Sequence, residues 1–80
     1  MTERPQTLGE KRVRVDFNPS QEGVVYDIKR HTAALIDLVE KLKRDQGESG
    51  SGECARLCAL AQTHYEDAAM WAVKAATTGR

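Results

Sequence analysis

The feature that most constrains the fold is a pair of long segments in which apolar residues recur at alternating steps of three and four. This spacing places the apolar side chains on one face of an α-helix. In the first segment, residues 20–44, the pattern is formed by Val25, Ile28, Leu35, Val39 and Leu42, with Thr32 filling one position of the register and Val24 and Ile36 widening the stripe. In the second segment, residues 53–77, it is formed by Cys54, Cys58, Ala61, Tyr65, Ala68, Ala72 and Ala75. The sequence therefore predicts two helices and an all-α fold.

The segment between the two predicted helices, residues 45–52, is rich in glycine and serine. Such a composition is typical of a flexible turn. At the start of the first helix, Pro19 cannot continue a regular hydrogen-bonding pattern, and Ser20 is a favourable N-cap residue. We therefore expect the two helices to fold back on each other as an antiparallel hairpin, in a single domain over residues 1–80.

The second predicted helix carries more apolar surface than one partner helix can bury. Its further apolar residues are Leu57, Leu60, Ala69, Met70, Trp71, Val73 and Ala76. A chain of 80 residues has a thin core, and domains of this size commonly gain stability from disulfides, metals or oligomerisation. We therefore expect the hairpin to pack against copies of itself in a homo-oligomeric helical bundle.

The N-terminal residues 1–19 do not show the helical pattern. The segment RVRVDF, residues 12–17, alternates charged and apolar side chains, which is typical of a half-buried strand. No other segment resembles a strand with which it would pair. We therefore predict an extended arm that lies along the helices and ends at Asn18-Pro19.

The composition argues against several classes of protein. Twelve basic and twelve acidic residues give a formal net charge of zero, whereas proteins that bind DNA or RNA polymers usually carry a basic excess. No apolar segment has the length of a membrane span or a signal peptide. Cys54 and Cys58 do not form a zinc-binding pattern with His31 and His64. We expect a soluble cytoplasmic protein with reduced cysteines, no metal and no cofactor.

The sequence gives little support for catalysis. It contains no Ser-His-Asp order, nucleotide-binding loop or metal motif. His64, Glu66 and Asp67 resemble an acid/base cluster, but neighbouring residues of a helix point in different directions. We therefore expect Glu66 and Asp67 to belong to a solvated acidic face and not to share a site. His31 is expected at the surface or in an interface. The prediction is that the protein is not an enzyme.

Two short basic clusters are candidates for an anion-binding site. KRVR, residues 11–14, supplies Arg12 and Arg14, whose guanidinium groups match phosphate oxygens in pairs. KRHT, residues 29–32, supplies Lys29 and Arg30. If the arm folds back over the first helix, both clusters contribute to one pocket for a small anion. The alternative is that the arm covers the helices with its valines while its arginines face water.

The quoted segments also resemble a known family. EKRVRVDFNPS, VVYDIKRHTAALIDLVEKL and LAQTHYEDAAMWAVKAAT are similar to the phage hairpin-domain proteins called anti-CBASS and anti-Thoeris sponges. The resemblance covers residues 8–78. It implies a non-enzymatic homo-oligomer, typically a hexamer, in the cytoplasm of the infected bacterium. It also implies binding of cyclic di- or trinucleotides, or of cyclised ADP-ribose derivatives, in pockets between protomers and without degradation of the ligand.

The resemblance also suggests which residues of this chain contact the ligand. Arg12 and Arg14 would hold phosphates or base edges, and the basic–x–Thr pattern of the family would fall on Arg30 and Thr32. The full set of candidates is Arg12, Arg14, Phe17, Asn18, Tyr26, Lys29, Arg30, Thr32 and Trp71, with Met70 beside Trp71 in an interface. Among these, Phe17, Tyr26 and Trp71 offer aromatic faces on which a base can stack.

Two other functions remain open from the sequence. The apolar second helix would suit a helical protein–protein interaction module, or an inhibitor of a host factor, with no nucleotide ligand. A small DNA-binding regulator that uses KRVR as a groove-binding arm is the third possibility, although the neutral net charge counts against it.

Overall fold

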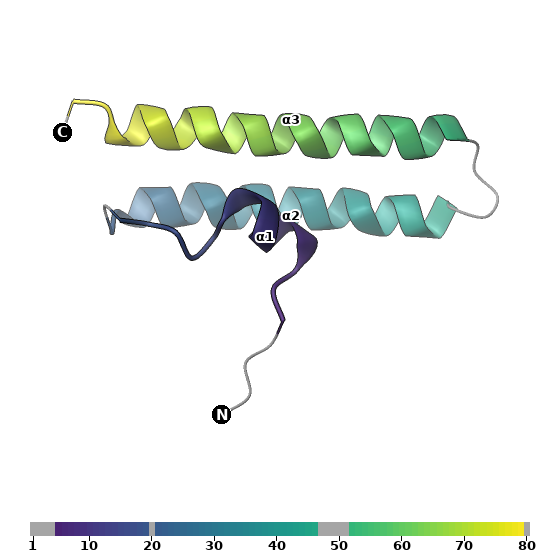
Figure 1. Cartoon of the computed structure of the whole chain (residues 1–80), viewed down its shortest axis with the longest axis horizontal. Helices are drawn as coiled ribbons and strands as arrows, with labels where there is room; N and C mark the ends of the chain where they lie inside the picture. Colours follow the sequence, from purple (N-terminus) through teal and green to yellow (C-terminus); the bar gives the residue numbers. More distant parts are fainter. Residues whose placement is uncertain (1–4, 20, 47–51, 80) are drawn as a thin grey trace.

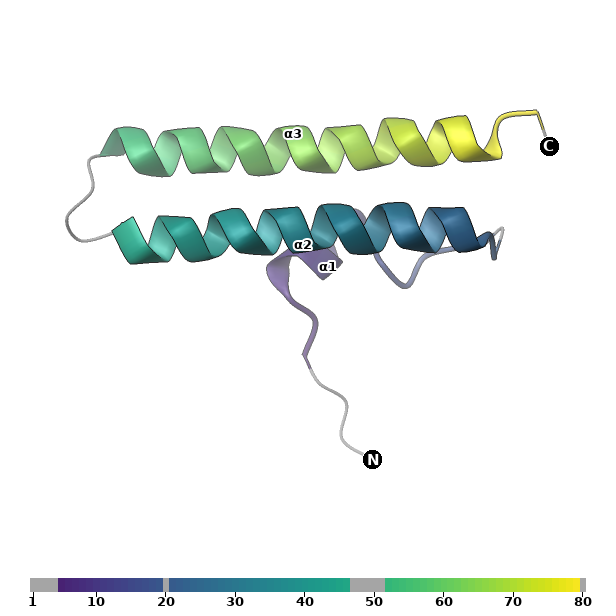
Figure 2. The same cartoon turned by 180° about the vertical axis from the view of Figure 1, so that it is seen from behind.

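The chain folds into three helices, and two of them form a long antiparallel hairpin (Figure 1). The computed structural model describes residues 5–19, 21–46 and 52–79. Helix α1 spans Leu8–Val13, α2 spans Gly23–Gln46 and α3 spans Gly52–Thr77. Helix α1 lies across one face of α2, as the two opposite views show (Figures 1 and 2). The residues within these ranges contain no strand, so the predicted all-helical hairpin is confirmed.

Helix α2 begins at Gly23 and not at residue 20. The backbone N–H of Tyr26 donates to the carbonyl of Glu22, which makes Glu22 the first acceptor of the helix. The side-chain amide of Asn18 donates to the same carbonyl at 3.0 Å. The predicted N-cap, Ser20, lies outside the described residues. The predicted turn covered residues 45–52, and most of it, residues 47–51, also lies outside them. Lys43 and Arg44 stand in the last turn of α2, where positive charge stabilises a helix.

Helix α1 corrects the prediction of an extended arm. Thr7 caps it: its hydroxyl accepts from the N–H of Glu10, and the Glu10 carboxylate accepts from the N–H of Thr7. This capping box satisfies two amides that would otherwise lack partners at the helix start. The alternating segment is therefore divided between the end of α1, at Arg12 and Val13, and a turn that follows it. A lone strand would have left its backbone groups unpaired, whereas a helix satisfies them locally.

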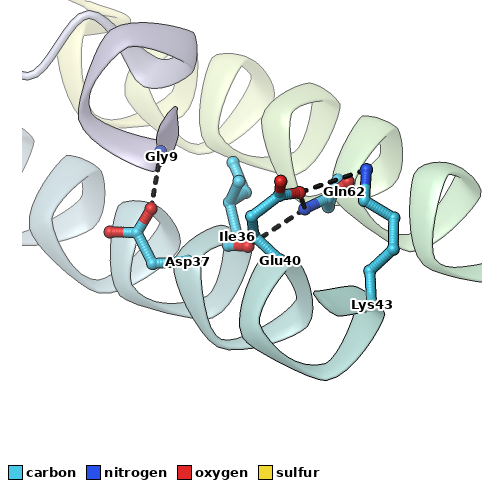
Figure 3. A network of polar contacts seen from close by, with 6 residues as sticks. All are labelled: Gly9, Ile36, Asp37, Glu40, Lys43 and Gln62. Carbon is cyan, nitrogen blue, oxygen red and sulfur yellow. Dashed lines mark hydrogen bonds and ion pairs between the residues drawn. The ribbon is translucent and has the colours of Figure 1, made fainter. Parts of the chain in front are cut away.

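The contact between α1 and α2 depends on a glycine. A Cβ atom on Gly9 would lie 2.1 Å from the carbonyl oxygen of Ala33, so only glycine allows the backbones to come this close. The N–H of Gly9 donates to Asp37 Oδ1 at 2.7 Å (Figure 3). Because this donor and acceptor are partly buried, the bond fixes the position of α1 on α2.

The core lies where the three helices meet. It is formed by Val13 of α1, Ala33 and Ile36 of α2 and Ala69 of α3. The seam is centred differently from the predicted one: Ile36, which was expected only to widen the stripe, is fully buried, whereas Leu35 and Leu42 of the predicted seam are exposed. The packed side of α2 is therefore rotated from the predicted stripe, because α2 must face both α1 and α3.

A polar network joins α2 to α3 within the hairpin (Figure 3). The buried Gln62 donates through Nε2 to the carbonyl of Ile36 at 3.2 Å and to Glu40 Oε1 at 3.0 Å. Glu40 also pairs with Lys43 at 3.2 Å. The hydrogen bond from Gln62, followed by that from Lys43, lowers the pKa of Glu40 below its ordinary value. A buried amide with both partners in place favours one register of the hairpin.

The hairpin face opposite α1 is rich in exposed apolar side chains. Asp37 marks the side of α2 that faces α1. At about 100° per residue, Leu35 and Leu42 lie roughly 140–160° around the helix from it. On α3, Trp71 lies about 160° from Val73, a residue that faces the α1 side. The exposed apolar face is formed by Val24, Leu35, Leu42, Leu57, Leu60 and Trp71, with Leu38, about 100° from Asp37, at its edge. Within the described ranges, no helix is both long enough and apolar enough to pass through a membrane.

Candidate ligand-binding groove

The turn after α1 brings an arginine and a phenylalanine together. Arg14 ends α1 in the left-handed conformation, with φ of 58°, and its carbonyl accepts from the N–H of Phe17 at 2.8 Å. The Arg14 guanidinium carbon lies 4.2 Å from the centre of the Phe17 ring, within the range of a cation–π contact. The two side chains therefore form one surface, cationic on one side and aromatic on the other.

Lys29 of α2 holds this turn in place. Its side chain is buried, and its ammonium donates to the carbonyl of Arg14 at 3.0 Å and to the carbonyl of Phe17. The ammonium also lies 5.3 Å from the centre of the Phe17 ring. Burial lowers the pKa of Lys29 below its ordinary value, and the charge of Arg14 lowers it further. Lys29 is therefore both a structural anchor and part of a positive region.

A groove of about 470 Å³ lies between this turn and α3. Its volume is in the range of pockets that bind small organic ligands. The α1 side and α2 provide a basic and aromatic wall, while α3 provides the opposite wall. The lining residues are Arg12, Val13, Arg14, Phe17, Lys29, Thr63, Glu66, Asp67, Ala69, Met70 and Val73.

Four of the sequence-predicted site residues meet in this groove, namely Arg12, Arg14, Phe17 and Lys29. The wall that α3 contributes was not predicted from the sequence. Glu66 and Asp67 are both exposed, as expected for a solvated acidic face. Both also line the groove, so the expectation that they do not share a site was wrong. The spacing of Glu66, Ala69, Met70 and Val73 follows one helix face and was the available signal, but it did not reveal which element this face would meet.

Tyr26 and Arg30 lie in a different place. They line a second hollow of about 270 Å³, together with Glu10, Val15, Ala33, Ala34 and Asp37. Within one protomer the structure therefore brings Lys29, but not Arg30, to the basic cluster of residues 12–14. The single pocket that we expected from both basic clusters is divided into two hollows.

The remaining candidates have local roles. Asn18 donates to the carbonyl of Glu22, and the Thr32 hydroxyl donates to the carbonyl of Ile28 at 2.8 Å. Trp71 is 56% exposed, and the Lys74 ammonium lies 5.2 Å from the centre of its ring. None of these three side chains lines either hollow. Met70, expected beside Trp71 in an interface, lines the groove instead.

The positive charges of the groove are not neutralised by ion pairs with the described residues. The ion pairs among the described residues join Lys41 to Asp45, Lys43 to Glu40 and Arg56 to Glu53. In the same part of the chain, no carboxylate pairs with Arg12, Arg14 or Lys29. Nor do the described residues contain a group of three or more His, Cys, Asp or Glu side chains able to hold a metal ion. The groove is therefore suited to bind an anion that also presents an aromatic face.

Comparison with known proteins identifies the family. Residues 9–77 match the family described as "Acb2/Tad1, hairpin domain". The chain belongs to this family. These are the anti-CBASS and anti-Thoeris sponges, phage proteins that bind cyclic nucleotides, so the resemblance seen in the sequence is confirmed. No curated protein and no solved structure matches the chain significantly.

Proposed function

We propose that this protein binds cyclic oligonucleotide second messengers and withholds them from host effectors without degrading them. The ligands would be cyclic di- or trinucleotides, and cyclised ADP-ribose derivatives are a further candidate class. The protein would act in the cytoplasm of an infected bacterium and block anti-phage signalling there. Family membership supports the general activity, and the groove supports the ligand chemistry.

The observation that carries the proposal is the combination of Arg12, Arg14 and Phe17 around one groove. Cyclic nucleotides combine phosphate anions with flat bases. Guanidinium groups bind phosphate oxygens in pairs, and an aromatic ring offers a stacking surface to a base. Lys29 adds a third positive charge and holds the turn in shape before the ligand arrives, which reduces the ordering cost of binding.

We propose that the working form is a homo-oligomer, a hexamer by analogy with the family. The exposed apolar residues opposite α1 gather on one face and are not scattered singly over the surface. Such faces commonly mark interfaces. In an oligomer, the candidates outside the groove would contribute from a protomer boundary. These candidates are Asn18, Tyr26, Arg30, Thr32 and Trp71.

A sponge depends on capacity and affinity rather than on turnover. Thermal denaturation with a panel of cyclic di- and trinucleotides and cyclised ADP-ribose tests this directly, because a ligand that binds the folded state raises the melting temperature. The bound compound should be recovered chemically intact after the protein is denatured. Recovery of a hydrolysed product would contradict sequestration, and a panel without any shift would contradict ligand binding.

The exposed apolar face also favours a second candidate, a helical module that binds another protein. The two candidates differ in what the purified chain does alone. A sponge would form a closed homo-oligomer and bind nucleotides, whereas an adaptor would bind no cyclic nucleotide. Light scattering combined with the thermal panel separates the two.

A further inference from the structure

The two walls of the groove carry opposite charge. Arg12, Arg14 and Lys29 line one wall, while Glu66 and Asp67 of α3 line the other. A ligand that is anionic all round would be repelled by the acidic wall. A ligand that fills the groove must therefore present phosphate to one wall and hydrogen-bond donors to the other.

Glu66 occupies the inner position on the acidic wall. It shares a helix face with Ala69, Met70 and Val73, at steps of three and four. Ala69 is buried in the core, so this face is turned toward the interior of the groove. Asp67 lies about 100° further round the helix, on the side of Thr63, and is therefore at the rim.

The carboxylate of Glu66 is free to accept hydrogen bonds. Across residues 5–19, 21–46 and 52–79, no hydrogen bond or ion pair occupies it. An ionised carboxylate offers two acceptor oxygens and no donor. It therefore pairs best with two adjacent N–H donors on the edge of a ligand.

Building on the proposed function, we infer that Glu66 selects a guanine base in the bound cyclic nucleotide. Guanine presents the N1–H and the N2 amino group side by side, so both carboxylate oxygens are satisfied at once. Adenine presents one amino donor beside the N1 acceptor, which the second carboxylate oxygen would repel. A site built around a pair of hydrogen bonds discriminates strongly against the base that lacks one of them. Phe17 and the basic wall would hold the ring and the phosphates.

The test is calorimetric titration with cyclic di-GMP and cyclic di-AMP. Wild type should bind cyclic di-GMP more tightly, by about tenfold or more. Glu66→Gln replaces one acceptor by a donor of nearly the same shape and should remove this preference, mainly by weakening cyclic di-GMP. Glu53→Gln makes the same change on the same helix, outside the groove, so it is the matched control and should keep the preference. Because residues 53 and 66 are both exposed on α3, both variants should melt close to wild type.

The outcomes separate this inference from the proposed function. Equal binding of the two ligands by wild type, binding confined to adenine-only ligands, or an unchanged preference in Glu66→Gln would overturn the inference and leave the sponge function standing. A lack of binding to cyclic di-GMP, cyclic di-AMP, cyclic trinucleotides and cyclised ADP-ribose would instead overturn the function itself.

Discussion

The ammonium of Lys29 donates to the carbonyl of Arg14 at 3.0 Å, and this contact joins α2 to the turn that presents the groove's basic side chains. Arg14 has a positive φ of 58°, a conformation that costs a residue other than glycine about 1 kcal/mol. The Lys29 ammonium holds the turn in place by donating hydrogen bonds to the carbonyls of Arg14 and Phe17. The shape of the binding surface therefore depends on a cation that is itself buried.

Lys29→Met should loosen the turn while the hairpin remains folded. Without the ammonium, the carbonyls of Arg14 and Phe17 lose a donor, and we expect a loss of about 1–3 kcal/mol in the free energy of unfolding. The amide of Phe17 should exchange with solvent faster, which hydrogen exchange measures. Lys41→Met is the control: Lys41 pairs with Asp45 at the surface, so this change should cost less than about 1 kcal/mol. Equal effects of the two changes would refute the anchoring role.

Gly9→Ala should destabilise the contact of α1 with α2. The new methyl group would clash with the backbone of Ala33, and such overpacking costs about 1–3 kcal/mol. Gly23→Ala is the matched control because a Cβ there meets no atom within 4 Å. Its effect should stay within about 1 kcal/mol. Chemical denaturation measures both, and a Gly9→Ala protein as stable as wild type would show that α1 does not pack as described.

Glu40 should make the stability of the hairpin depend on pH in the acid range. Its pKa is lower in the folded protein than its ordinary value of 4.5. The network therefore stabilises the fold at pH values above that ordinary pKa, and this stabilisation is lost as the pH falls through the folded-state pKa. Melting temperatures measured from pH 6 to pH 3 should fall more steeply for wild type than for Glu40→Gln, which keeps an acceptor for Gln62 but does not titrate. Parallel curves would rule out a contribution from Glu40.

Leu38→Glu should break the proposed oligomer and leave the protomer helical. Leu38 is 62% exposed at the edge of the apolar face, where a carboxylate buried in an interface would be strongly unfavourable. Light scattering should then report a smaller mass, and circular dichroism should still show helix. Ala55→Glu, an exposed site on another face of α3, should leave the mass unchanged. If Leu38→Glu has the mass of wild type, the apolar face is not the interface.

The long helices could be predicted because their apolar pattern extends over many turns. Helix α1 was missed because its last residues continue into an alternating segment, and six residues are too few to show a helical period. The signal that identifies it is the Thr7–Glu10 capping box, which is visible in the sequence as TLGE. Alternation alone does not distinguish a strand from a short helix followed by a turn.

The candidate groove was predictable only on one side. Arg12, Arg14 and Lys29 are recognisable as potential anion ligands from their charge and from the family resemblance. Glu66 and Asp67 are exposed, as predicted, but their place in the groove was not predicted because periodicity describes each helix alone. Their place opposite the basic wall depends on how α3 is rotated against α1, which the pattern within α3 does not determine.

The most direct test of the central claim is calorimetric titration of three proteins with the cyclic nucleotide that stabilises wild type most. The proteins are wild type, Arg12→Ala and Lys11→Ala, which removes a neighbouring charge that does not line the groove. We predict that Arg12→Ala weakens binding by at least about tenfold, equivalent to about 1.4 kcal/mol, with its mass and melting temperature unchanged, while Lys11→Ala binds like wild type. Undiminished binding by Arg12→Ala, or equal losses in both variants, would contradict the assignment of the groove as the ligand site.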